Sequence, residues 1–319
     1  MKYARLMRGA VAVAAGSALL LAGCSAKSDQ KPAADGGAAS ESLDVFATTG
    51  YLADAVKNIA PDANITTMVG PGGDPHTYQP TTKDLETMQA ADLTVWTGLH
   101  MEAQMLDQLE GLGDKQIAVG EMLPKENLLD WPETDDKGNP LHDPHIWNSP
   151  DNWILVTGYI ADKLAEVDPA NAETYKANAK KYQDEIATAK ADAEKAFEGL
   201  ATRVLVTGHD AFNYLGASFN LEIHATDFVS SEAQLSAADI DALAKMVAEK
   251  KVPVIFQDNL ANPQAIQHLQ EAVKKAGWDV QISDKELFAD SLGAEEGVDT
   301  YLGVFKHNVD AIVEALGGK

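Results

Sequence analysis

The sequence predicts an α/β protein with two parallel-sheet lobes joined by one long, rigid helix. Short apolar strands alternate with amphipathic helices over 44–119, and the same alternation returns over 203–316. This alternation is typical of parallel sheets covered by helices on both faces. Between the two sets, 170–198 contains no Gly or Pro and is rich in Ala, Lys, Glu and Gln, which favours one continuous helix.

The first lobe is assigned to 44–165 and begins with a strand. Ser149 and Pro150 mark the start of its last helix, with Ser as the cap and Pro at the first helical position. The strands are expected at 44–49, 65–69, 93–97 and 116–119, and the helices at 51–59, 101–109 and 150–164.

The linking helix is assigned to 166–201 and the second lobe to 202–319. Pro169 opens the helix, which would span about 45 Å if it continues to Leu200. In the second lobe, Ser236 caps a helix with Asp239 in its first turn, and Gly277 ends the next helix. Strands are expected at 203–207, 221–224, 252–256 and 280–282, with helices at 265–276 and 298–316.

The amino-terminal segment carries the features of a bacterial export signal. Residues 1–23 have a basic start and a short apolar stretch, 10–21, below the roughly 20 residues that cross a bilayer as a helix. The stretch ends at Leu21-Ala22-Gly23-Cys24, which resembles the lipobox of bacterial lipoproteins and implies lipidation of Cys24. Residues 24–43 lack aromatics and form the expected flexible tether of the lipid-anchored protein. We therefore expect a location on the extracytoplasmic face of the cell membrane.

Charge and cysteine content limit the classes of function. The formal net charge is −24, which argues against nucleic-acid binding and fits a soluble, exposed surface. Cys24 is the only cysteine, so no disulfide is available. The core of about 275 residues must be stable by itself, and that length suffices for two lobes.

Four residues at the ends of expected elements are candidate metal ligands. They combine nitrogen and oxygen donors, which transition metals prefer. Each lies in a loop next to an expected strand or helix, where binding groups tend to occur. Loops that follow parallel strands share one edge of a sheet, where α/β folds bind ligands. The candidates are His76, His145, His209 and Asp290.

The first two histidines lie in matching tripeptides, Asp74-Pro75-His76 and Asp143-Pro144-His145. Each proline fixes φ and removes a backbone donor. The aspartate either accepts the second ring N–H of its histidine, which selects the tautomer, or only forms the turn typical of Asp-Pro. The sequence leaves both roles open.

Spacing by itself does not establish one shared site. The four candidates are 69, 64 and 81 residues apart, which is no local metal motif, and a loop histidine is usually just solvated. His100 also follows a strand, and His142 lies three residues before His145. We interpret the remaining histidines as structural: His224, His268 and His307.

From Val45 onward the chain resembles the zinc- and manganese-binding lipoproteins of bacterial metal ABC importers, the cluster A-I or cluster 9 solute-binding proteins. Several specific stretches occur in the family's order across nearly the whole chain after the tether. These are Gly73-Asp74-Pro75-His76-Thr77-Tyr78-Gln79-Pro80, Thr97-Gly98-Leu99-His100-Met101-Glu102, Asp143-Pro144-His145-Ile146-Trp147, His209-Asp210-Ala211-Phe212-Asn213-Tyr214-Leu215 and Asp290-Ser291-Leu292-Gly293.

The resemblance implies that His76, His145, His209 and Asp290 are the metal ligands, two from each lobe, and that His100 is not a ligand. Two departures leave the metal open. The loop before the second ligand is short and acidic, whereas many zinc members have a long His-rich loop there. Many manganese members have Glu at the position of His209. Three imidazoles and one carboxylate favour zinc, while a bidentate Asp290 would admit manganese.

The expected function is therefore capture of Zn²⁺ or Mn²⁺ as transported cargo and delivery to an ABC transporter permease, by a monomer that is not an enzyme. One alternative is a zinc-dependent hydrolase, which needs an open coordination position and a nearby base. The others are a surface adhesin, which needs an exposed apolar patch, and a siderophore binder, which needs a roomy cleft lined by Arg or aromatic residues.

Overall fold

The structure, a computed structural model, describes residues 42–135, 137–226, 235–260 and 263–317. The expected export signal, Cys24 and nearly all of the tether lie outside these described residues. Among the helices described, none is both long enough and apolar enough to cross a membrane.

A four-stranded parallel sheet forms the centre of the amino-terminal lobe. Its strand order is β2-β1-β3-β4, and neighbouring strands are parallel. The chain therefore returns to the same end of the sheet before each new strand begins. Val45 lies between Ile65 and Leu93 in register. The strands are β1 (Asp44–Ala47), β2 (Asn64–Thr67), β3 (Leu93–Trp96) and β4 (Gln116–Ala118), and the helices that follow them are α1 (Gly50–Ile59), α2 (Thr82–Ala90) and α3 (Leu106–Glu110).

The helix expected at 101–109 begins later than the sequence suggested. A 3₁₀ turn, Ala103–Met105, precedes α3, and Gly98, Leu99 and His100 have φ angles of 77°, 53° and 69°. These left-handed conformations are unfavourable for residues other than glycine. The buried Glu102 accepts hydrogen bonds from the N–H groups of two residues in this turn, Thr97 and Gly98. That carboxylate stabilises a local turn that helix propensity does not anticipate.

An antiparallel hairpin that the sequence analysis did not predict follows the first sheet. It consists of β5 (Asp130–Thr134) and β6 (Pro140–His142). The hairpin leads directly into Asp143 and the 3₁₀ turn Ile146–Asn148. Further 3₁₀ turns lie at Gly113–Lys115, Gly120–Met122 and Lys125–Asn127.

The 3₁₀ turn Pro169–Asn171 and α5 (Ala172–Phe197) connect the two lobes, and they follow α4 (Pro150–Val167), the last helix of the amino-terminal lobe. Ser149 caps α4 by accepting the N–H of Asn152, with Pro150 at the first helical position. At 26 residues, α5 is about 39 Å long. It starts three residues after Pro169, because the proline opens the 3₁₀ turn instead of the α-helix.

The carboxy-terminal lobe also contains parallel strand pairs, one of four-residue strands and one of two-residue strands. A backbone hydrogen bond from Phe256 N to Val206 O joins its two strand pairs. The parallel pairs are β7 (Val204–Thr207) with β8 (Glu222–Ala225) and β9 (Val254–Ile255) with β10 (Gln281–Ile282). The helices are α6 (Asn213–Phe219), α7 (Ala237–Lys250), α8 (Pro263–Lys275) and α9 (Tyr301–Leu316).

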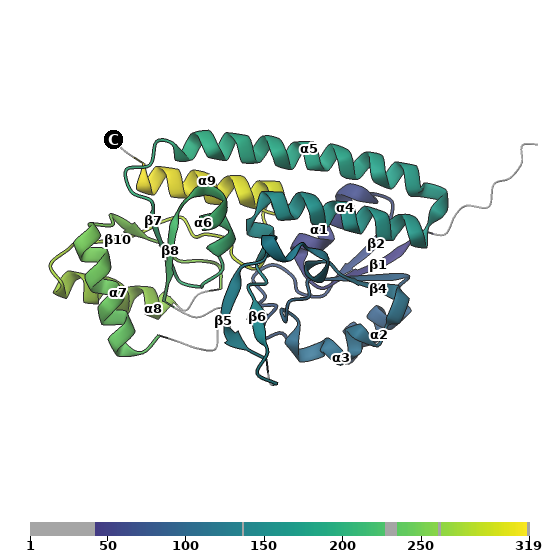
Figure 1. Ribbon diagram of the computed structural model, residues 1–319, viewed down its shortest axis with the longest axis horizontal. Helices are drawn as coiled ribbons and strands as arrows, with labels where there is room; N and C mark the ends of the chain where they lie inside the picture. Colours follow the sequence, from purple (N-terminus) through teal and green to yellow (C-terminus); the bar gives the residue numbers. More distant parts are fainter. Residues whose placement is uncertain (1–41, 136, 227–234, 261–262, 318–319) are drawn as a thin grey trace, which may run out of the picture. The chain divides into compact units, whose positions relative to one another are not determined.

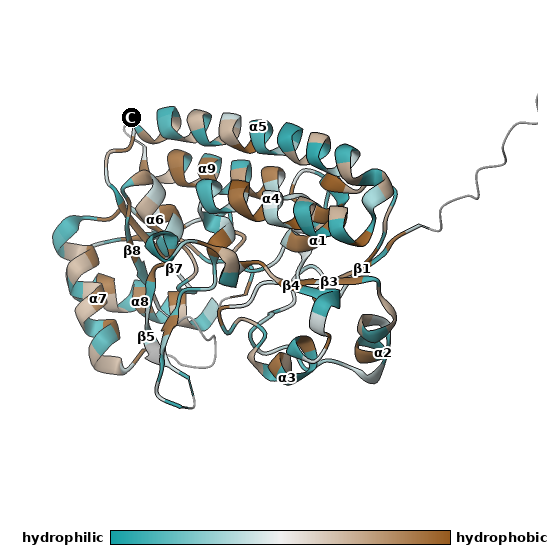
Figure 2. Cartoon of the chain, turned by 45° about the vertical axis from the view of Figure 1, so that its right-hand side comes forward, coloured by the Kyte–Doolittle hydropathy of each residue, from teal (hydrophilic) through white to brown (hydrophobic). Residues whose placement is uncertain are grey.

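Helix α5 extends over α9 at one end and over α4 at the other (Figure 1). The first part of α5 buries Tyr182 and Ile186 in the core around β1 and β3, and its last part buries Phe197 in the core around α6. Helix α9 does the same, with Tyr301 in the first core and Ile312 in the second. In Figure 2, α5 is largely hydrophilic in colour, whereas α9 and α4 beneath it carry more hydrophobic residues. The α/β fold class with a parallel sheet and one long linking helix is confirmed, and α9 is a second helix shared by the lobes.

Candidate metal centre

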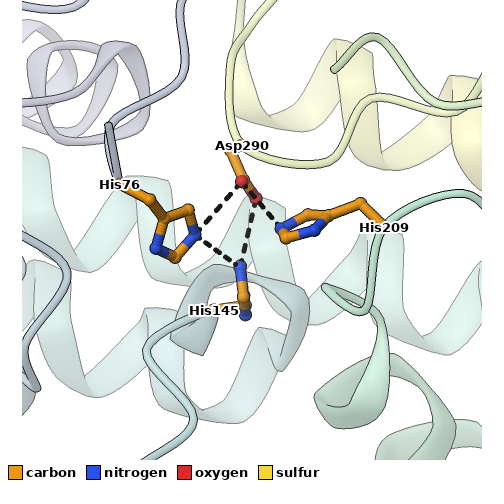
Figure 3. A group of neighbouring side chains, drawn as sticks. All are labelled: His76, His145, His209 and Asp290. Atoms are coloured by element: carbon orange, nitrogen blue, oxygen red, sulfur yellow. Dashed lines mark hydrogen bonds and ion pairs between the residues drawn. The ribbon is translucent and has the colours of Figure 1, made fainter. Parts of the chain in front are cut away.

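His76 lies in the loop after β2, and Asp74 sets its backbone. One carboxylate oxygen of Asp74 accepts the His76 N–H at 2.8 Å, and the other accepts the Thr77 hydroxyl at 2.9 Å. These contacts make the aspartate-stabilised turn that the Asp-Pro sequence favours. The turn directs the His76 imidazole toward the carboxy-terminal lobe (Figure 3).

His145 is oriented by Asp143 through two hydrogen bonds. Asp143 Oδ1 lies 2.9 Å from the His145 backbone nitrogen and 2.7 Å from the ring Nδ1. Because a carboxylate can only accept, Nδ1 carries a proton, which leaves Nε2 as the ring atom that can bind a metal in the neutral imidazole. The sequence left two roles open for this aspartate, bonding to the ring or only forming the turn. Asp143 bonds to the ring and also makes the turn contact.

His209 and Asp290 come from two loops of the carboxy-terminal lobe. His209 follows β7, and its backbone N–H donates to the buried Asp258 at 2.6 Å. Thr207 donates its hydroxyl to the His209 carbonyl at 2.8 Å. Asp290 follows Leu287, which is joined to Asp258 by a parallel bridge. Both loops thus leave neighbouring extended segments at one end of the lobe.

The four candidate side chains converge on one point between the lobes (Figure 3). Their exposed fractions are 8% for His76, 0% for His145 and 1% for both His209 and Asp290. The Nε2 atoms of His76 and His145 are 3.2 Å apart. Asp290 Oδ2 lies 3.3 Å from His76 Nε2 and 3.1 Å from His209 Nε2, and Oδ1 lies 3.3 Å from His145 Nε2. All four ligand atoms lie within 4.8 Å of one another, the one such group of three or more found in the part of the chain described.

These separations fit a small divalent cation. Donors about 2.0 Å from a tetrahedral ion are about 3.3 Å apart, close to the four distances found here. Among the described residues, both ring nitrogens of His209 and both carboxylate oxygens of Asp290 are buried without a hydrogen-bond partner. Buried polar atoms normally have a partner, and a cation bound at the centre would supply one to His209 Nε2 and to both Asp290 oxygens.

The electrostatics of the group favour bound positive charge. Burial alone would raise the pKa of Asp290, but attraction to His209 and His145 outweighs it and holds the pKa well below its ordinary value. Burial would lower the pKa of His145, but Asp290 and Asp143 outweigh it and raise the pKa to about 10. The pKa of His209 is raised in the same way by Asp290, whereas burial lowers the pKa of His76. The ionised Asp290, together with Asp143 beside His145, thus attracts protons to the pocket, and a metal ion would displace them.

The other histidines make separate contacts. His142 Nδ1 lies 3.7 Å from Asp130 Oδ1 on the hairpin. His224 Nε2 lies 2.9 Å from Glu222 Oε1, and His307 Nε2 lies 2.9 Å from the Glu286 carbonyl. None of these, nor His100 or His268, belongs to the converging group that the described residues form.

Several residues around the centre escaped the sequence analysis. Trp131 of β5 packs edge-on against His76, with ring centroids 6.4 Å apart, and lies 6.5 Å from the His145 ring. Trp131 lies in the short acidic stretch before His145, and nothing in its spacing points to the site. Trp147 was noted only as part of a motif, yet its ring lies 5.4 Å from that of His145.

A helix-linked pair of α/β lobes with three imidazoles and one carboxylate buried between them defines a solute-binding protein for metal ions. Comparison with known proteins places the chain more narrowly. It belongs to the family described as "Zinc-uptake complex component A periplasmic", which matches residues 45–315.

Individual relatives agree with this assignment. The chain is 30% identical over 319 residues to the manganese-binding lipoprotein MntA of Bacillus subtilis, covering 98% of this chain and 100% of the relative. It is 34% identical over 278 residues to the zinc-binding protein TroA of Treponema pallidum, covering 85% of this chain and 88% of TroA. The solved structure of the periplasmic zinc-binding protein TroA superposes with a TM-score of 0.80 at 33% identity, covering 87% of this chain and 100% of that one.

Proposed function

We propose that this chain captures zinc or manganese outside the cytoplasm and delivers it to a membrane ABC importer. The observation that carries the proposal is the buried convergence of three imidazole Nε2 atoms and the two oxygens of Asp290, joined by four contacts of 3.1–3.3 Å. Membership of the zinc-uptake component family supports the carrier function over a hydrolase, an adhesin or a siderophore binder.

His76, His145, His209 and Asp290 are the proposed ligands. Together they supply four protein donors, which fill a tetrahedral shell. A catalytic zinc site keeps one position open for water or substrate, so we further propose that the bound ion is cargo and takes part in no catalysis.

Zinc is the cargo that the geometry fits better. The donor separations match bonds of about 2.0 Å, the length typical of zinc with histidine. However, the two oxygens of Asp290 lie against different histidines, so both face the centre. A second carboxylate donor would raise the coordination number toward that of manganese. The names of the relatives divide in the same way, one manganese-binding and one zinc-binding.

We propose that the metal bridges two lobes, assigned to 44–165 and 202–319. The segment 166–201 links these lobes along the chain. His76 and His145 would bind from the first lobe and His209 and Asp290 from the second. Because α5 and α9 are both packed into the cores of both lobes, opening is expected to be small and to involve the ligand loops.

The proposed location rests on the amino-terminal sequence and on relatives named as lipoproteins. Residues 1–23 would be the export signal, Cys24 the lipidated residue and 24–43 the tether to the outer face of the membrane. The partner would be the permease of a metal ABC importer, which the protein serves as a monomer. Replacing Cys24 by Ala should move the protein from the membrane fraction to the soluble extracytoplasmic fraction.

Metal-binding calorimetry on metal-stripped protein tests the function. The wild type is expected to bind one zinc or manganese ion per chain, and His145→Ala is expected to weaken binding strongly while keeping the helical circular dichroism. His268→Ala, at an exposed position of α8, is the matched control and should bind as the wild type does. Equal affinity of His145→Ala and wild type would remove His145 from the shell.

A further inference from the structure

The carbonyl group of Ala289, next to Asp290, receives two hydrogen bonds from the amino-terminal lobe. The hydroxyl of Tyr51, in α1, donates to it at 3.1 Å. The indole Nε1–H of Trp147, in the turn after His145, donates at 2.9 Å. Both donors cross from one lobe to the backbone that carries the only carboxylate of the metal centre.

Tyr51 and Trp147 form one rigid unit. Their rings are stacked, with centroids 4.9 Å apart and planes 17° apart, and both side chains are buried. The Trp147 ring also packs edge-on against the His145 ring. The aromatic pair therefore contacts a ligand of one lobe and fixes the chain beside a ligand of the other.

The carboxy-terminal lobe holds the same segment from the opposite side. Asn259 accepts the Ala289 N–H at 2.9 Å, and its side-chain amide donates to the Ser291 hydroxyl at 2.7 Å. That hydroxyl also accepts the Gly72 N–H, from the loop of the first histidine, at 3.0 Å. The segment 289–291 is thus fastened to both lobes by its backbone and by Ser291.

The Asp290 side chain itself lacks such support. Neither of its oxygens has a hydrogen-bond partner among the residues that the structure describes. Apart from its contacts with the three histidines, the carboxylate depends on its backbone for its position, and the backbone is set by the bonds at Ala289 and Ser291.

Building on the proposed metal-carrier function, we propose that Tyr51 and Trp147 are positioning residues that hold Asp290 at coordinating distance through the Ala289 carbonyl. They touch the peptide beside the ligand and not the metal. Opening the site by moving the Asp290 loop away from the amino-terminal lobe breaks both of their bonds. Loss of one of them therefore weakens the bound state without altering any ligand.

Tyr51→Phe is the sharpest test, because it removes one hydroxyl and keeps the ring that stacks on Trp147. Tyr182→Phe is the matched control, since Tyr182 is a similarly buried tyrosine whose hydroxyl donates to Asp54 of α1 and not to the backbone beside a ligand. We expect Tyr51→Phe to raise the dissociation constant for zinc about fivefold, the effect of one net hydrogen bond, with faster release to a chelator. Tyr182→Phe should leave both quantities unchanged. Trp147→Phe, which removes the other donor, is expected to act in the same direction.

A double-mutant cycle with Asp290→Ala separates positioning from general destabilisation. If Tyr51 acts through Asp290, Tyr51→Phe should change zinc affinity in the wild-type background and have no further effect once Asp290 is removed. Wild-type affinity in Tyr51→Phe, or an equal loss in both backgrounds, would overturn the inference. A wild-type protein that binds no zinc or manganese would instead overturn the proposed function, and this inference with it.

Discussion

Replacing Asp143 with Asn probes how the protein prepares a histidine for metal. In the structure, Asp143 Oδ1 accepts the His145 ring proton at 2.7 Å, and Oδ2 accepts the side-chain amide of Asn213 at 3.1 Å. An asparagine has only one accepting oxygen, so it can satisfy only one of these two donors. If its amide nitrogen faces His145, the imidazole must place its proton on Nε2, the atom that faces the metal centre.

The size of the effect follows from the contact that is lost. A hydrogen bond to a charged group contributes about 1.5–3 kcal/mol, or roughly 10- to 150-fold in an equilibrium constant. Removal of such outer partners of histidine ligands typically costs about 10- to 100-fold in metal affinity. We therefore expect the zinc dissociation constant of Asp143→Asn to rise about 10- to 100-fold.

Zinc titration against a competing chelator at constant pH measures this change. Asp168→Asn is the control, because Asp168 likewise accepts two hydrogen bonds, from Asn171 and Tyr175, at the far end of α4. A change of less than threefold in Asp143→Asn would refute the argument that Asp143 selects the His145 tautomer.

Three further predictions follow from the site and the core. Asp290 and Asp143 raise the pKa of His145 to about 10, so the metal-free pocket holds a proton that the metal displaces. Metal affinity should therefore rise between pH 7 and 9, about tenfold per pH unit for each proton released. Calorimetry in buffers of different ionisation enthalpy counts the protons, and a count of zero would contradict the prediction. Zinc at 100 times its dissociation constant should add about 2.7 kcal/mol to the free energy of unfolding, seen as a higher melting temperature that His145→Ala does not show. Ile186→Ala empties a buried position of α5 and should lower the free energy of unfolding by about 2–5 kcal/mol, measured in urea. Its zinc affinity should stay within about twofold of the wild type. A variant as stable as the wild type would argue against the shared core.

The sequence predicted the regular elements best where local signals are strong. Ser149 and Pro150 marked the start of α4, and the absence of Gly and Pro marked α5. Helix α2 escaped notice because it buries only Met88 and is defined mainly by its capping box at Thr81. The β5–β6 hairpin escaped because its strands are short, one carries Pro132, and the turn between them is acidic.

The sequence predicted which residues form the candidate site but not how their side chains are arranged. His76, His145, His209 and Asp290 stood out by their loops and by resemblance to a known family, since their separations in sequence carry no information on distance. The roles of Tyr51 and Asn259 could not be predicted, because each depends on a backbone contact with a residue far along the chain. A lone tyrosine in an amphipathic helix looks the same whether it fills a core or fixes a ligand loop.

The sharing of α9 between the two cores has a consequence for biosynthesis. Tyr301 and Val304 complete the interior around β1 and β3, although more than 200 residues separate them from those strands. While the ribosome is still making the middle of the chain, the segment already emerged lacks part of its own interior and exposes apolar surface to water. Native folding of this lobe must therefore wait until translation has passed residue 304, when nearly the whole chain has been made.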